Sequence, residues 1–599
     1  MSNYSKHKDR APQDTIFEIQ SILNKAGLFP VLHHIEKEFD GACSNRVTLY
    51  PTSLGTNGKG TDELFATASG YGELMERIQN NLLAPGGMFK CLKDYGGFSC
   101  YRDEKEITLT ELIEQKDSCL DNFFRIMGRV TADDKLDFLR EINGSIYART
   151  DDKITVIPFA DVTENKLVWL PLNFTYAFYG SNGMAAGNTL EEAFVQAMSE
   201  IFERHVNKKV VYGEVVPPEI PREYLREYSF WNLIEQIESG GNYEVSVRDC
   251  SLGKNYPVTA TIIIDKSRGT FGIKFGAHPS FAVSVERNLT ESLQGKKMQM
   301  FTSMNMIGSD SDALRLNNLP NITKMGYGIY SAKLFSDKPD WEFKPWDYWT
   351  GLSNLEFFKK MLAIIKSEGY HPLFRDSSHL GFPACYILVP GFSETFYLNE
   401  IRIREFWTIA KVIKSISKFP ALSAEEEDRL LRLIRFKEYS AVENKLRVIM
   451  NRPIKEGFMS LNRVGAFLAL KKGLFEQAIH FFRKIKNTEQ NESERLYLDC
   501  LIEYTRLLSR KIDQTAALKI IKKLFRDEIA ARVVYEVEDP AEMMRRVFPQ
   551  MKCYDCKNCE LSEKYCDNLA EEKVFVKIKD ALSKSTVSQE NLLDYFKNL

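Results

Sequence analysis

Two segments of the sequence share a pattern of two glutamates three residues apart within an amphipathic stretch. Glu73-Leu-Met-Glu-Arg77 and Glu200-Ile-Phe-Glu-Arg204 carry this pattern, and each follows a stretch rich in glycine and asparagine that we expect to form a turn. At about 100° per residue, both glutamates of a segment fall on one face of a helix, opposite apolar side chains. The pattern therefore predicts two helices, each with an apolar side and a carboxylate side.

Neighbouring residues extend these polar faces, and a third segment adds another. Ser69 joins the first face, and Glu192 and Gln196 join the second. After Phe275-Gly-Ala-His-Pro279, a third helical pattern groups three polar residues opposite a row of valine and leucine. These polar residues are Arg287, Glu291 and Gln294.

Two interpretations of the three polar faces stay open. Glutamates at this spacing usually form solvated helix faces, often in ion pairs with lysine. Alternatively, the three faces converge on one polar cavity, where a divalent cation neutralises carboxylates that would otherwise repel one another. Such oxygen ligands select Mg²⁺, which commonly bridges to phosphate. The occurrence of three similar helices favours convergence.

The stretch Gly55-Thr-Asn-Gly-Lys-Gly-Thr61 raises the question of a phosphate-binding loop. A P-loop needs its lysine directly after the last glycine, and a hydroxyl residue directly after that lysine. Gly60 separates Lys59 from Thr61, so the P-loop interpretation fails. We expect instead that Lys59 or backbone N–H groups meet phosphate, while the following helix brings metal ligands.

Composition excludes several classes of partner. The chain has 599 residues and a formal net charge of -2, with acidic and basic residues interspersed, so we expect no direct nucleic-acid contact. The charged start has no apolar segment behind it, and no apolar run approaches the length of a membrane span. The cysteine pattern is not that of a disulfide-stapled secreted domain. We therefore expect a cytoplasmic protein that contacts no membrane.

Three stretches resemble, in order and spacing, the nucleotide-binding motifs of YcaO-domain proteins. They are TNGKGTDELFATASGYGELMER, SNGMAAGNTLEEAFVQAMSEIFERHV and FGAHPSFAVSVERNLTESLQG, and the resemblance covers about residues 1–400. With its helical tail, the whole chain is similar to the free-standing bacterial YcaO subfamily. The resemblance implies an ATP-binding domain of mixed sheets and packed helices. The predicted fold is therefore α+β, with this domain followed by an all-α, tetratricopeptide-like domain.

The resemblance also implies ATP and Mg²⁺ as cofactors that carboxylates hold. The motifs match as magnesium ligands Glu73, Glu76, Glu200, Glu203 and Glu291. They match as nucleotide contacts Ser181, Asn188, Glu192, Gln196, Arg287 and Gln294. Near the N-terminus, Lys8 and Thr15 stand where the family places a lysine and a hydroxyl residue near the phosphates, and we add Lys59 from its loop and Ser69 from its helix face. For Glu192 an alternative stays open, because Thr189-Leu-Glu-Glu192 also fits a capping box that would occupy its side chain.

Family members that act as enzymes activate a backbone amide of a peptide. A nucleophile adds to the amide carbon, ATP phosphorylates the resulting oxyanion, and phosphate leaves. Such chemistry needs no protein nucleophile and depends on positioning and charge neutralisation. We expect Glu76 and Arg287 to take part in catalysis. None of the eight histidines lies in a recognisable catalytic context, and we expect His278 in the third motif to pack structurally.

Two functions from different classes stay open. One is an ATP-hydrolysing enzyme that activates a protein or peptide amide for a thioamide, azoline or related modification. The chain ends Asp594-Tyr-Phe-Lys-Asn-Leu599 without the proline-rich tail usual in azoline-forming members, which disfavours azoline synthesis. The other is an ATP-binding accessory protein that supports β-methylthiolation of a small-subunit ribosomal protein, with a methylthiotransferase or the ribosomal protein as partner.

Helical periodicity dominates the chain beyond Leu398. Residues 469–482 have the spacing of a tetratricopeptide turn and second helix, although a non-repeat bundle stays open because an array needs about three repeats. We expect this region to carry self-association, as a homodimer. The predicted domains are residues 1–400 for ATP and Mg²⁺ binding, 401–548 for the helical tetratricopeptide-like part, and 549–599 for a cysteine cluster and a helical tail.

The cysteine cluster has the sequence CYDCKNCELSEKYC. Its C-x₂-C-x₂-C-x₆-C spacing suits a four-cysteine site for Zn²⁺ or an iron–sulfur cluster. Free surface thiols are the alternative, although clustered free thiols invite oxidation. The candidate ligands are Cys553, Cys556, Cys559 and Cys566.

Overall fold

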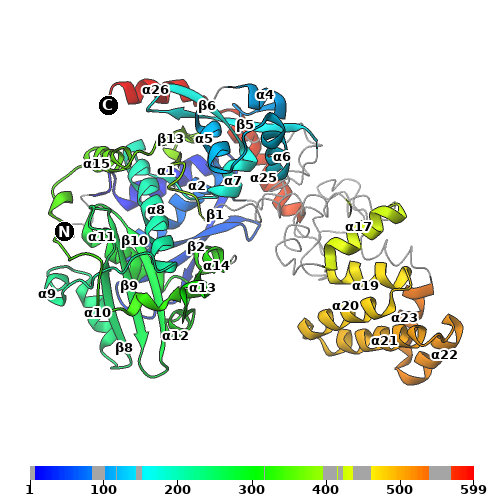
Figure 1. The fold of residues 1–599 in the computed structure, drawn as a ribbon. Coiled ribbons are helices and arrows are strands. Elements are labelled where there is room, and N and C mark those ends of the chain that lie inside the picture. Colours follow the sequence, from blue (N-terminus) through cyan, green and yellow to red (C-terminus); the bar gives the residue numbers. More distant parts are fainter. Residues whose placement is uncertain are drawn as a thin grey trace.

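The computed structural model describes residues 7–83, 101–115, 118–143, 151–315, 318–395, 415, 422–435, 461–538 and 568–599. Figure 1 shows a larger part made of sheets and helices, and a smaller part made of helices. The predicted α+β fold is confirmed, and the described elements beyond residue 400 are all helices. Among the described residues, no helix is both long and apolar enough to cross a bilayer.

A three-stranded antiparallel sheet contains the glycine-rich stretch before the first glutamate helix. Its strands, in order, are β1 (Phe29–Ile35), β2 (Cys43–Tyr50) and β3 (Gly55–Gly60). The prediction of a turn at Gly55–Gly60 is wrong, because this segment pairs with β2 along its whole length. A Cβ atom on Gly58 would overlap the carbonyl oxygen of Ala66 in the next helix, so glycine allows the strand and helix backbones to pack directly together.

The larger part also contains two larger sheets. The five-stranded sheet has the order β12-β11-β10-β9-β8 and is antiparallel apart from the β11–β12 pair. Its strands are β8 (Tyr243–Asp249), β9 (Val258–Asp265), β10 (Thr270–Ala277), β11 (Asn305–Gly308) and β12 (Gly328–Ser331). The six-stranded sheet has the order β4-β5-β13-β14-β7, with β6 paired to β5. Its strands are β4 (Lys105–Thr108), β5 (Lys153–Asp161), β6 (Lys166–Pro171), β7 (Met184–Ala186), β13 (Leu373–Asp376) and β14 (Ala384–Leu388).

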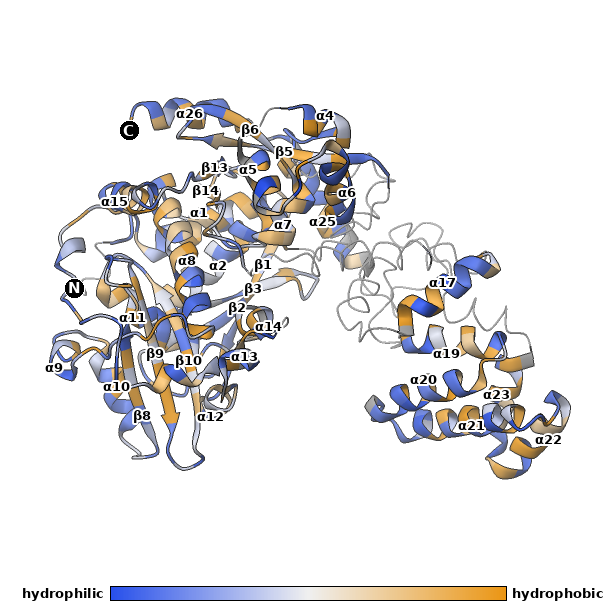
Figure 2. Cartoon of the chain, in the orientation of Figure 1, coloured by the Kyte–Doolittle hydropathy of each residue, from blue (hydrophilic) through white to orange (hydrophobic). Residues whose placement is uncertain are grey.

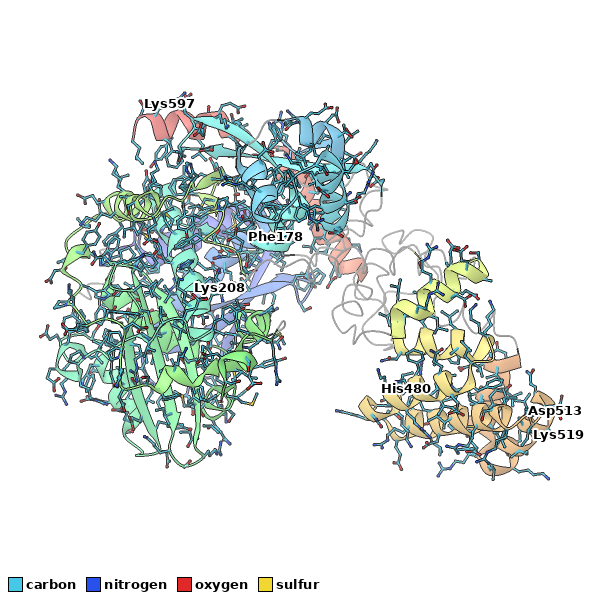
Figure 3. All side chains as sticks on the ribbon, in the orientation of Figure 1. Phe178, Lys208, His480, Asp513, Lys519 and Lys597 are labelled. Carbon is cyan, nitrogen blue, oxygen red and sulfur yellow. The ribbon has the colours of Figure 1, made fainter. Side chains whose placement is uncertain are left out.

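The three predicted amphipathic helices are α2 (Glu63–Gln79), α8 (Leu190–Val211) and α11 (Phe281–Ser292). Helix α2 begins after Asp62, whose carboxylate accepts hydrogen bonds from the backbone N–H groups of Leu64 and Phe65. Helix α8 runs through the middle of this part and contacts β7, β10 and β14. Even Lys208, near the end of α8 and labelled in Figure 3, is buried. Its Nζ donates to the carbonyl oxygen of Glu394 at 3.4 Å.

Further helices complete this part of the chain. They are α1 (Pro12–Lys25), α4 (Leu109–Glu114), α5 (Ser118–Ile126), α6 (Ala132–Asn143), α7 (Leu172–Phe178), α9 (Arg222–Leu225), α10 (Trp231–Glu238), α12 (Met298–Thr302), α13 (Asp310–Ala313), α14 (Asn318–Met325) and α15 (Asn354–Ser367), with short 3₁₀ turns η3 (Ala332–Phe335) and η4 (Asp347–Trp349). Helix α15 packs against α8.

The smaller part has a hydrophobic core of its own. Its helices are α17 (Ala424–Arg435), α19 (Leu461–Lys471), α20 (Phe475–Thr488), α21 (Glu492–Ser509), α22 (Gln514–Leu524) and α23 (Asp527–Glu538). Consecutive helices pack together, and Figure 2 shows hydrophilic and hydrophobic stretches side by side on them, as amphipathic helices require. Their assignment as tetratricopeptide repeats stays a prediction.

The final helices, α25 (Asn568–Ser583) and α26 (Gln589–Lys597), return to the larger part. Phe575 joins a core that α1 and α2 also supply. Phe596 packs 4.6 Å from Phe374 and 5.8 Å from Phe194, measured between ring centroids. Helices α25 and α26 therefore pack into the core of the larger part. The predicted domain boundary at residue 549 stays a prediction. The cysteine cluster lies outside the described residues.

Candidate functional site

A cavity of about 340 Å³ lies between α2, α8, α11 and the residues around the start of α1. All three predicted carboxylate faces line it. Ser181 is not among the lining residues and lies in the turn before β7, where its carbonyl oxygen accepts a hydrogen bond from the N–H of Met184. The predicted residues that line the cavity are Lys8, Thr15, Lys59, Ser69, Glu73, Glu76, Asn188, Glu192, Gln196, Glu200, Glu203, Arg287, Glu291 and Gln294.

On α2, two glutamates share one arginine. The guanidinium of Arg77 lies 3.1 Å from Glu76 Oε1 and 3.3 Å from Glu73 Oε1. Burial raises the pKa of Glu76 to about 8, and the carboxylates of Glu200 and Glu73 add to the rise, whereas Arg77 opposes it. A further cation at this place would therefore stabilise the ionised form of Glu76.

Helix α8 repeats this pairing at the same place in its motif. Arg204 Nη2 lies 3.4 Å from Glu200 Oε1, and Nη1 donates to the carbonyl oxygen of Thr323 on α14 at 3.4 Å. Burial lowers the pKa of Arg204, but the carboxylates of Glu200 and Glu203 outweigh it and raise the pKa overall. Glu203 is itself buried, at 7% exposure. The second carboxylate pair is thus also balanced by an arginine.

On α11, Glu291 is surrounded by cations. It forms an ion pair with Lys59 of β3, and its carboxylate lies 3.4 Å from Lys274 Nζ and 3.9 Å from Arg287 Nη2. Arg287 Nη1 also donates to Gln196 Oε1 on α8 at 2.8 Å. Burial, together with the charges of Arg287 and Lys274, holds the pKa of Lys59 well below its ordinary value. An anionic ligand would relieve this crowding of positive charge.

The other end of the cavity is built around Glu192. Its carboxylate lies 3.0 Å from Lys8 Nζ and accepts hydrogen bonds from the backbone N–H of Asp9 and from Asn188 Nδ2. Thr15 Oγ1 donates to Asn188 Oδ1 at 2.7 Å. Burial raises the pKa of Glu192, but Lys8 and the N–H of Asp9 outweigh it, so the pKa is lowered overall. The N-terminal segment is therefore tied to the start of α8.

These contacts bear on the two interpretations of Glu192. Thr189 does cap α8, because its hydroxyl accepts from the N–H of Glu192 at 3.1 Å. The carboxylate of Glu192, however, makes its hydrogen bonds with Lys8, Asp9 and Asn188 rather than closing a capping box. The side chain therefore belongs to the cavity.

The remaining predicted residues have more ordinary surroundings. Gln294 Nε2 donates to the carbonyl oxygen of Asn57 at 3.1 Å. His278 is buried, its Nδ1 accepts from the N–H of Ser280 at 2.9 Å, and its ring packs 5.8 Å from that of Phe357. This environment is that of a structural histidine, as expected.

The cavity also contains residues that sequence reasoning did not select. Arg77 and Arg204 end the two repeated motifs at the same position, and that repetition was a signal for a shared role. Glu286 had no such signal: its Oε2 is buried without a hydrogen-bond partner among the described residues, and burial raises its pKa to about 7. The polar lining residues that were missed are Arg10, Thr61, Arg77, Arg204, Glu286 and Thr290.

The chemistry of the donor set fits a hard cation together with an anionic ligand. Seven glutamates and several lysines and arginines line one cavity, and oxygen ligands suit Mg²⁺. Within the described residues, no three acidic, histidine or cysteine side chains stand close enough to hold an ion as they are. Arginine and lysine neutralise the carboxylates in this arrangement. Metal binding would therefore exchange these ion pairs for metal–oxygen contacts.

Comparison with known proteins identifies the family. The family model described as YcaO cyclodehydratase, ATP- and Mg²⁺-binding, matches residues 57–393, which is more than half of the 599-residue chain. The chain belongs to the YcaO family. The matched range includes α2, α8 and α11, so the carboxylate helices lie within the ATP- and Mg²⁺-binding YcaO domain.

The chain is also similar to a curated relative and to solved structures. The Escherichia coli K12 protein named ribosomal protein S12 methylthiotransferase accessory factor YcaO is 31% identical over 439 residues, covering 71% of this chain and 72% of that protein. A structure described as a heterocyclase in complex with substrate and cofactor is 21% identical, with a TM-score of 0.45; the match covers 65% of this chain and 53% of that chain. A structure described as YcaO from Methanopyrus kandleri bound with AMPPCP and Mg²⁺ is 16% identical, with a TM-score of 0.38; the match covers 64% of this chain and 92% of that chain.

Proposed function

We propose that this YcaO protein uses ATP and Mg²⁺ to phosphorylate a backbone amide of a protein or peptide substrate. The observation that supports this proposal most is the convergence of three carboxylate helices on one cavity that lysine and arginine side chains also line. The first interpretation of the helices, as solvated faces, does not account for Glu203 and Glu192, which are buried. Membership of an ATP- and Mg²⁺-binding family adds independent support.

The roles of individual residues follow from their charges and places. Lys8, Lys59 and Arg287 would meet phosphate oxygens. When bound, Mg–ATP supplies the phosphoryl group that turns the amide oxygen into a leaving group. Arg287 would neutralise charge at the transferring phosphoryl group and Glu76 would help to hold the metal, so we assign both to catalysis. The magnesium ligands would be Glu73, Glu76, Glu200, Glu203 and Glu291.

A second function has an observation in its favour. The Escherichia coli relative is named as an accessory factor of a methylthiotransferase. In that alternative, the protein binds ATP in the same cavity and supports β-methylthiolation of a small-subunit ribosomal protein without acting on the amide itself. The cavity would then gate an interaction, with the helical part holding the modification enzyme or its substrate.

An isotope experiment separates the two functions. If the protein activates an amide, the oxygen of that amide leaves on the phosphate derived from ATP. A candidate polypeptide with ¹⁸O in its backbone amides should therefore give labelled phosphate, and substitution of Glu76 or Arg287 should abolish the label. If ATP turns over in the presence of the polypeptide and the label stays wholly in the polypeptide, the enzymatic function is refuted and the accessory function is the better account.

A further inference from the structure

A second cavity, of about 270 Å³, shares no lining residue with the first. One wall is the 251–256 loop between β8 and β9, and the other is the segment 341–349. This segment, WEFKPWDYW, holds three of the six tryptophans of the whole chain, and all three line the cavity. We name it the aromatic pocket. Its aromatic lining residues are Tyr256, Trp341, Trp346, Tyr348 and Trp349.

The walls of the aromatic pocket are firmly built. Trp346 is 8% exposed and its ring lies 5.2 Å from that of Phe281 at the start of α11. Trp341 Nε1 donates to the buried carboxylate of Asp249 at 3.1 Å. On the opposite wall, Leu252 and Asn255 have φ values of 54° and 59°. Such left-handed backbone at non-glycine residues costs free energy and persists where the surroundings determine it, often at binding sites.

The charges around the aromatic pocket favour a neutral occupant. Glu342 and Lys344 both line it and have opposite charges. Asp249 is satisfied by Trp341 and by the hydroxyl of Ser251 at 3.0 Å. The ring of Tyr348 already carries a cation on one face, since Lys360 Nζ lies 4.0 Å from the ring centroid. The one acidic and the one basic side chain leave the lining residues with no net charge to favour a cation.

Residues that line the pocket carry hydrogen-bond donors. The side-chain N–H of Trp346 and of Trp349 and the hydroxyl of Tyr348 find no acceptor among the described residues, whereas Trp341 does. Aromatic walls with N–H and O–H donors are the features that bind polyproline II segments, because proline rings pack on aromatic faces and the backbone carbonyl groups accept hydrogen bonds.

Ring contacts connect the aromatic pocket to the cavity between α2, α8 and α11, which we name the nucleotide cavity. Trp349 lies 6.3 Å from Phe357 of α15, and Phe357 lies 5.5 Å from His7. The residue after His7 is Lys8, which forms the ion pair with Glu192. In addition, Asn354 Nδ2 contacts the carbonyl oxygen of His7 and Asp9 Oδ1, at 3.3 and 3.0 Å. Only the side chains of Trp349 and Phe357 therefore separate a ligand in the aromatic pocket from the N-terminal segment whose Lys8 pairs with Glu192.

We propose that the aromatic pocket binds a proline-containing, extended segment of the polypeptide on which this protein acts. The proposal rests on the proposed function for the identity of that polypeptide. It adds a recognition element that is separate from the amide to be modified. Binding there anchors the polypeptide beside the nucleotide cavity, and it requires neither ATP nor Mg²⁺.

Fluorescence anisotropy of a labelled octaproline peptide on the full chain, without nucleotide, tests the proposal. We expect saturable binding that Tyr348→Ala weakens by about tenfold, because one aromatic contact is lost, and that Tyr348→Phe weakens much less. Tyr348 is 38% exposed, so its replacement leaves the core intact. Labelled octaalanine and tetramethylammonium as competitor are the control ligands.

Each outcome has a consequence. Absence of octaproline binding up to about millimolar concentration, or equal binding by the wild type and Tyr348→Ala, refutes the proposal. Displacement of the peptide by tetramethylammonium would identify a cation site instead and also refutes it. Octaproline binding combined with ¹⁸O retained wholly in the polypeptide would keep the aromatic pocket as a recognition site while the amide-activating function fails.

Discussion

Replacement of Gly58 by alanine tests the direct contact between β3 and α2 that places the first pair of glutamates. A Cβ atom there would overlap the carbonyl oxygen of Ala66 and lie 2.7 Å from the backbone nitrogen of Gly70. Both are backbone atoms of α2, so the helix must shift. Overpacking of this kind typically costs about 1–3 kcal/mol. We expect the α2 amides to exchange with deuterium about 5 to 150 times faster than in the wild type.

Gly72 supplies the matched control within the same helix. A Cβ atom on Gly72 meets no atom within 4 Å, and alanine is favoured over glycine in a helix interior by about 0.5–1 kcal/mol. The Gly72→Ala variant should therefore show unchanged or slower exchange in α2. Hydrogen exchange with mass spectrometry measures both variants locally and needs no two-state assumption. Equal exchange in Gly58→Ala and the wild type would refute the packing argument.

Three further predictions concern other parts of the chain. Burial, with Arg375 nearby, lowers the pKa of His379 to about 4, so its stabilising contribution is complete above the unfolded pKa of about 6.5 and is lost as the pH falls toward 4. The free energy of unfolding, measured with urea, should fall by about 2 kcal/mol more between pH 7 and 5 in the wild type than in His379→Gln. An equal fall in both proteins would contradict the assignment. Elemental analysis after anaerobic purification should find zinc, or iron with sulfide, at the cysteine cluster; near-zero content of these elements would leave free thiols. Light scattering should show a smaller oligomer when a flexible linker replaces residues 396–567 and α25 and α26 are retained, whereas an unchanged oligomer would remove self-association from the helical part.

The sequence predicted the three helices because each has a local periodicity. Leu74, Met75 and Ile78 of α2 are fully buried, as the spacing requires, while Glu73 and Glu76 line the cavity. The convergence of the helices could be inferred only indirectly, since it depends on long-range packing of three sheets.

Other features were beyond local patterns. The glycines of β3 suggested a turn, but they are needed for close approach to α2, and only the packed structure shows what lies beside them. Lys59 pairs with Glu291, which is 232 residues away in the sequence. The return of α26 to the larger part, where the hydroxyl of Tyr595 donates to Glu191 Oε1 at 2.6 Å, likewise has no local signal.

The central claim is that the carboxylates of α2, α8 and α11 form one Mg–ATP site. Calorimetric titration of ATP with and without Mg²⁺ tests it on Glu73→Gln and Glu203→Gln, with Glu63→Gln as control, because Glu63 is on α2 but does not line the cavity. We predict that Mg²⁺-dependent ATP binding is lost in the first two variants and retained in the control. Unchanged affinity in both Glu73→Gln and Glu203→Gln would contradict the claim and return these faces to the role of solvated helix surfaces.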